Sequence, residues 1–109
     1  MSTFEDREQA FENKFKYDQD MLFKINSRRA RLIGLWAAER LGITGEKAEA
    51  YAQEVVSADL DEPGHADIIR KLQADFKAKS LDISDHRISK ELERQWEIAR
   101  QQIAPPQAN

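Results

Sequence analysis

Apolar residues recur along this chain at steps of three, four and seven, which is the spacing of one face of an α-helix. The longest such stretch covers residues 18–41 and continues an apolar stripe that begins near the start of the chain. Gly42 stands where a left-handed residue ends a helix, and Arg40 lies in the last turn, where a cation meets the negative helix end. The inward face predicted for this helix consists of Leu22, Ile25, Leu32, Ile33 and Trp36.

Three shorter amphipathic stretches follow the first one. We predict a second helix that is capped by Thr44 and runs to about residue 58, and a third over residues 66–79. A fourth is capped by Ser84 or Asp82 and ends before two consecutive prolines. The inward positions predicted for these three helices are Ala48, Tyr51, Ala52, Val55, Val56, Ile68, Ile69, Leu72, Phe76, Ile88, Leu92, Trp96, Ala99 and Ile103.

No segment alternates between apolar and polar residues with a period of two, so a sheet has no obvious source. Four amphipathic helices joined by short loops predict an all-α fold, a four-helix antiparallel bundle over residues 18–104. An N-terminal arm over residues 1–17 precedes it, and a disordered tail over residues 105–109 follows.

The arm carries three aromatic side chains, Phe4, Phe11 and Phe15, on the same helical face as the stripe behind it. As one helix, residues 4–41 would span roughly 57 Å, and no other segment reaches more than about half of that length. The arm therefore folds back onto the bundle, docks on a partner, or is disordered. Residue types alone leave these alternatives open.

Composition excludes several classes of protein. A chain of 109 residues is one domain with a modest core, and its net charge of −3 argues against a general nucleic-acid binder. There is no cysteine, hence neither a disulfide framework nor a thiolate metal site. Apolar runs are too short to span a membrane and the start of the chain is acidic, so we expect a cytoplasmic protein without membrane insertion.

The sequence nominates no catalytic residue and no metal site. His65 and His86 are far apart and neither has a second ligand three or four residues away, which favours two surface histidines. No sequence motif brings a serine together with a histidine as a nucleophile and its base. We therefore expect a protein that is not an enzyme.

Positive charge concentrates in the first helix, where Arg28, Arg29 and Arg31 stand close together. Guanidinium groups suit phosphate and carboxylate, so these three are candidates for an anion-binding patch. The alternative is a neutralising contact with the acid-rich second helix. Aromatic residues for base stacking are not interleaved with them, which counts against nucleic acid.

Four blocks of the sequence, residues 10–15, 32–42, 50–56 and 61–64, resemble the zeta-subunit family of alphaproteobacterial F-type ATP synthases, small proteins that inhibit ATP hydrolysis. The blocks occur in order over nearly the whole chain, and the most distinctive is Gly-Leu-Trp-Ala-Ala-Glu-Arg-Leu-Gly, which ends at Gly42.

This resemblance implies a bundle with an inhibitory arm that enters the catalytic interface between the alpha and beta subunits beside gamma, and blocks hydrolysis while permitting synthesis. It also implies a protein that is monomeric when free and is held at the inner membrane through the synthase, without a cofactor. The partner-binding residues expected from it are Phe4, Arg7, Phe11, Lys14, Phe15 and Lys16.

The family is also associated with weak adenine-nucleotide binding on the bundle, for which Arg28, Arg29 and Arg31 are the candidates in this sequence. The competing interpretation is a generic helical adaptor or an adenine-nucleotide sensor, in which the arm is only part of the fold.

Overall fold

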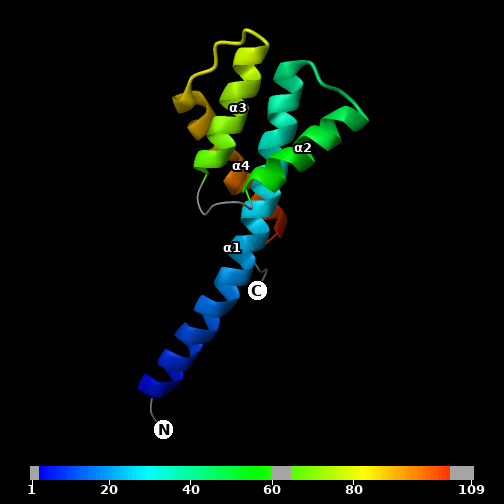
Figure 1. The fold of residues 1–109 in the computed structure, drawn as a ribbon. Helices are drawn as coiled ribbons and strands as arrows, with labels where there is room; N and C mark the ends of the chain where they lie inside the picture. The colour runs from blue at the N-terminus through cyan, green and yellow to red at the C-terminus, as the bar shows by residue number, and fades with distance from the viewer. Residues whose placement is uncertain (1–2, 60–64, 104–109) are drawn as a thin grey trace.

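The computed structural model describes the backbone of residues 3–59 and 65–103 and the side chains of residues 19–59 and 65–103. Within these residues it contains four helices and no strand, so the predicted all-α four-helix bundle is confirmed. The predicted arm side chains from Phe4 to Lys16 and the predicted tail lie outside the described residues. The helices are α1 (Thr3–Leu41), α2 (Glu46–Asp59), α3 (Ala66–Ala78) and α4 (Asp85–Ile103) (Figure 1).

Helix α1 is a single unbroken helix of 39 residues, about 58 Å long at 1.5 Å per residue. The arm and the first bundle helix of the sequence interpretation are therefore one element. Its C-terminal part lies beside the other helices, and its N-terminal part runs away from them (Figure 1). This projection gives the molecule a longest dimension of 65 Å against 26 and 21 Å in the other directions.

Helix α1 is also the centre of the bundle, because α2 and α4 both pack against its C-terminal half and α3 lies against α2 and α4. Trp36 meets Phe76 edge to face, with ring centroids 6.0 Å apart, and Arg40 covers the Trp36 ring at 4.3 Å. Leu81 and Ile83, in the connector before α4, pack on the same core. The buried residues of this core are Ala30, Ile33, Trp36, Ala37, Ala38, Leu41, Tyr51, Val55, Ile68, Leu72, Phe76, Ile88 and Leu92.

The closest approach between helices occurs at Gly34, where α1 crosses α2. A Cβ atom at this position would lie 2.7 Å from the Cα of Ala52, nearer than Cβ atoms come to other atoms. Gly34 on α1 and Ala52 on α2 are both small, which is what lets the two helices come this close. A glycine inside a helix costs stability by itself, and here the tight contact explains it.

Helix ends follow the predicted signals with one exception. Gly42 has φ +75°, and the Ile43 amide donates to the Ala38 carbonyl at 2.9 Å, which closes α1 as predicted. The Ser84 Oγ accepts a hydrogen bond from the Arg87 amide at 3.1 Å, so Ser84 rather than Asp82 caps α4. The exception is Thr44, because α2 begins at Glu46 and the residue before it is Gly45.

Candidate functional site

Two features of the described residues stand apart from an ordinary helical bundle. One is an apolar segment of α1 just before that helix enters the bundle. The other is a cavity between α1 and α4 that contains a buried arginine.

The apolar segment corrects part of the sequence interpretation. Leu22 belongs to the inward stripe predicted for the first helix, yet 43% of its surface is exposed, and the neighbouring Phe23 is 64% exposed. The first fully buried stripe residue is Ile25. The reason is the reach of α4: its last turn meets α1 at Arg28, where Gln102 Oε1 accepts a hydrogen bond from the guanidinium at 3.1 Å.

The three candidate arginines point to different places. Arg28 bonds to Gln102 on α4, and Arg31 forms an ion pair with Glu49 on α2 at 2.6 Å, which is the neutralising contact considered above. Arg29 is 6% exposed and lines the cavity. The structure thus brings only one of the three predicted anion-binding residues into a cavity.

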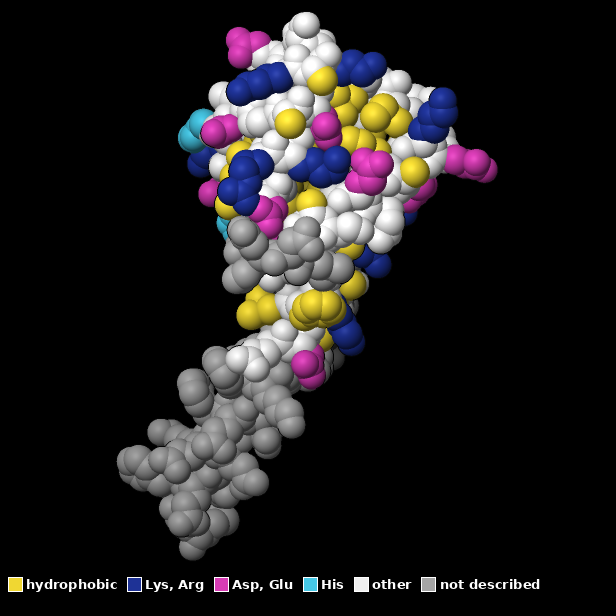
Figure 2. Space-filling model, viewed as in Figure 1, with side chains coloured by type: hydrophobic (Ala, Val, Ile, Leu, Met, Phe, Trp, Pro, Cys, Tyr) yellow, Lys and Arg dark blue, Asp and Glu magenta, His cyan; other side chains and the backbone are white. Residues whose placement is uncertain are grey.

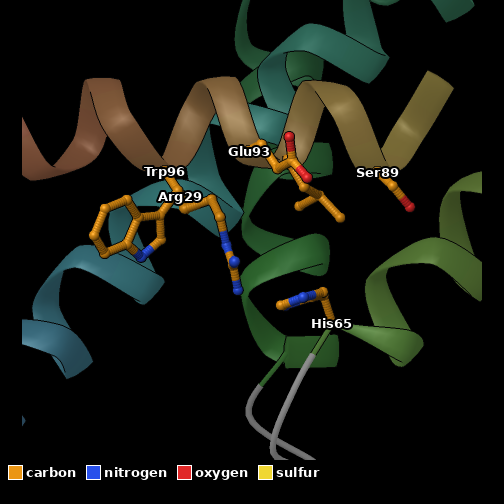
Figure 3. A pocket seen from close by; sticks show the side chains of 6 residues that line it. Arg29, His65, Ser89, Glu93 and Trp96 are labelled. Atoms are coloured by element: carbon orange, nitrogen blue, oxygen red, sulfur yellow. The ribbon is translucent and has the colours of Figure 1, made fainter. Parts of the chain in front are cut away.

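The cavity has a volume of about 300 Å³ and is lined by Arg29 of α1, by His65 just before α3, and by residues of α4 (Figure 3). The Arg29 guanidinium extends toward His65, and the Trp96 ring lies on the other side of it (Figure 3). Trp96, predicted as a core residue, is only half buried because it forms this wall. The α4 residues that line the cavity are Ser89, Leu92, Glu93 and Trp96.

Arg29 is the electrostatic centre of the cavity. Burial lowers the pKa of its guanidinium, and attraction to Asp59 partly opposes that shift. Burial likewise raises the pKa of Asp59, against the attraction of Arg29 and His65. Among the described residues, the Arg29 Nε atom is buried and has no hydrogen-bond partner. A buried donor of this kind is costly unless a ligand satisfies it.

The cavity does not assemble a nucleophile and a base. Ser89 and His65 both line it, but the Ser89 hydroxyl points away from the imidazole (Figure 3). No cluster of three or more potential metal ligands occurs among the side chains that the structure describes. The arrangement suits binding of an anion rather than group transfer.

Sequence reasoning did not identify Phe23, Gly34 or the partners of Arg29 in the cavity. Phe23 lies off the inward stripe, so its exposure agrees with helical periodicity, but its apolar side chain drew no attention as a surface residue. His65 and Trp96 meet Arg29 only through the bundle topology, since they come from three separate segments. For Gly34, a signal existed in the small residues that face it across the helix crossing.

Comparison with known proteins assigns the chain to a family. No curated protein matches it. One solved structure, titled only as a solution NMR structure, is 41% identical, covers 75% of this chain and 93% of its own, and superposes with a TM-score of 0.67. No helix of residues 3–59 or 65–103 is long and apolar enough to cross a membrane. The sequence model of one family, described as ATPase inhibitor subunit zeta, matches residues 1–102, and the chain therefore belongs to that family.

Proposed function

We propose that this protein inhibits ATP hydrolysis by the F-type ATP synthase by inserting its N-terminal arm, residues 1–17, between the alpha and beta subunits beside gamma. The observation that supports this most strongly is the length of α1. Helix α1, with 39 residues, is longer than the helices that pack on it, so its C-terminal part lies in the bundle and its N-terminal part extends beyond it. Because the chain belongs to an ATPase inhibitor family, we assign binding of the ATPase to the part of α1 that extends beyond the bundle.

A continuous helix suits the role of a wedge because it resists bending. An arm already helical on docking loses less conformational entropy than one that must fold in the cleft. Phe4, Phe11 and Phe15 are the proposed anchors, and each can contribute about 1.5–3 kcal/mol if fully desolvated. Arg7, Lys14 and Lys16 then supply charge complementarity and register more than net affinity.

The proposal places the protein in the cytoplasm, as a monomer when free and at the inner membrane only through the synthase. It assigns no catalytic residue and no cofactor to the chain. A generic helical adaptor, the competing interpretation, would bind without stopping hydrolysis, so an activity measurement separates the two.

The test is ATP hydrolysis by the purified synthase with increasing amounts of added protein. We expect the parent to inhibit, and the variant Phe11→Ala/Phe15→Ala to lose inhibition while it unfolds at the same denaturant concentration. Asn13→Ala, a change between the two anchors on the opposite helical face, is the matched control and should inhibit normally. If the double variant inhibits as well as the parent, the anchor assignment is wrong.

A second function, weak adenine-nucleotide binding, is supported by the buried and unpartnered Nε of Arg29 in the cavity. A phosphate group would satisfy this donor, and the Trp96 ring offers a surface for stacking. Because Arg31 is engaged by Glu49, we expect Arg29 to dominate. Titration of 15N-labelled protein with ADP should shift amide signals of α4 in the parent and in Arg31→Met, but not in Arg29→Met. Equal shifts in all three would exclude the cavity as the site.

A further inference from the structure

Leu22 and Phe23 form an apolar pair on the surface of α1, beyond the reach of α4. They are the two large apolar side chains that the structure exposes within the described residues, at 43% and 64%. Hydrophobic side chains gather at the surface where α1 leaves the bundle (Figure 2). A single exposed apolar side chain is ordinary on a protein surface, whereas a contiguous apolar patch marks a contact surface.

Leu22 continues the apolar stripe of the arm, and Phe23 lies beside that stripe. Leu22 follows Phe15 by seven residues, the same step that separates Phe11 from Phe4. Because α1 is unbroken from Thr3 to Leu41, this step keeps one helical face over the whole distance. One turn further on, Ile25 occupies that face and is buried in the bundle. The stripe therefore changes from an intramolecular contact to an exposed surface between residues 25 and 22.

From this continuity we infer that Leu22 and Phe23 belong to the docking surface for the ATPase, which extends past the end of the arm to the rim of the bundle. The inference rests on the proposed function and names the same occupant, an apolar cleft in the catalytic sector. Gln19 and Asp20, one turn before the pair, are polar and exposed. An apolar centre with a polar rim of this kind is typical of a protein–protein contact.

The inference makes a specific claim about inhibition. Because Leu22 is 43% and Phe23 64% exposed and neither belongs to the buried core, Leu22→Ala/Phe23→Ala should unfold at nearly the same denaturant concentration as the parent. In the hydrolysis assay it should raise the half-inhibitory concentration about tenfold or more, the effect of losing two partly desolvated apolar side chains. Lys24→Ala, on the same turn but on the opposite face, is the matched control and should leave this concentration unchanged.

The possible results separate this inference from the proposed function. If Phe11→Ala/Phe15→Ala abolishes inhibition but Leu22→Ala/Phe23→Ala inhibits like the parent, docking ends within the arm and the inference is overturned while the function stands. If the parent itself does not inhibit, both are overturned. Sedimentation of the parent gives the remaining outcome: a dimer that becomes monomeric in Leu22→Ala/Phe23→Ala would mean that a second copy covers the pair instead.

Discussion

Replacing Gly34 by alanine sets two physical effects of opposite sign against each other. Alanine is the better helix former by about 1 kcal/mol, so helix propensity alone predicts a more stable protein. Packing predicts the reverse. The new methyl group would lie 2.7 Å from the Cα of Ala52, 3.2 Å from its Cβ and 3.3 Å from the Cβ of Val55.

The nearest of these atoms, the Ala52 Cα, decides whether the substitution raises or lowers the free energy of unfolding. A backbone Cα cannot rotate away as a flexible side chain does, so α1 and α2 must separate and loosen the core around them. Overpacking of this kind costs about 1–3 kcal/mol, and contact with backbone places Gly34→Ala toward the upper end. After subtraction of the propensity gain, the expected net loss is about 1–2 kcal/mol in the free energy of unfolding.

Urea unfolding followed by circular dichroism measures this loss directly. The exposed substitution Ala74→Gly in α3 calibrates the propensity effect in the same protein, and it should cost about 1 kcal/mol without any packing contribution. Gly34→Ala should lower the urea midpoint and leave the m-value unchanged. A Gly34→Ala protein that is as stable as the parent, or more stable, would refute the assignment of a tight helix crossing.

Three further substitutions test local features of the bundle. Tyr51→Phe removes the hydroxyl that donates to the Asp75 carboxylate at 2.6 Å and should cost about 1–2 kcal/mol in urea unfolding. Ser80→Gly relieves a non-glycine residue at φ +59° and should raise the thermal midpoint, by about 0.5–1 kcal/mol of stability. Burial raises the pKa of Asp59, so the folded state holds its proton more tightly than the unfolded state does. The parent should therefore lose stability relative to Asp59→Asn as the pH rises above about 4, the usual pKa of an aspartate, as measured by unfolding at each pH.

The sequence was sufficient to predict the number of helices and most of their inward faces. Period 3.6 is a local property, so Ile68, Leu72 and Phe76 identify the buried side of α3 without any knowledge of its neighbours. Helix ends were equally readable where the signal is chemical, as at Gly42 and Ser84. These features depend on a few consecutive residues.

What could not be predicted depends on how far neighbouring helices extend. Periodicity places Leu22 on the inward stripe, but only the end of α4 near Arg28 decides that Leu22 stays exposed. The same limit applies to Trp96, which shares its stripe with core residues and yet forms a cavity wall. Ser80 in the left-handed region gave no signal, since glycine or asparagine is the usual residue there.

The tight crossing at Gly34 has a mechanical consequence at the far end of the molecule. From Gly34 to Thr3 the helix measures roughly 46 Å, so the position of its N-terminal end depends on the direction that the helix axis takes at the crossing. A change of about 5° in the crossing angle, well within the usual scatter of helix packing, would swing the tip by about 4 Å. The orientation of the N-terminal part of α1 is thus controlled by the packing at Gly34, a residue too far away to contribute to any contact at the helix end.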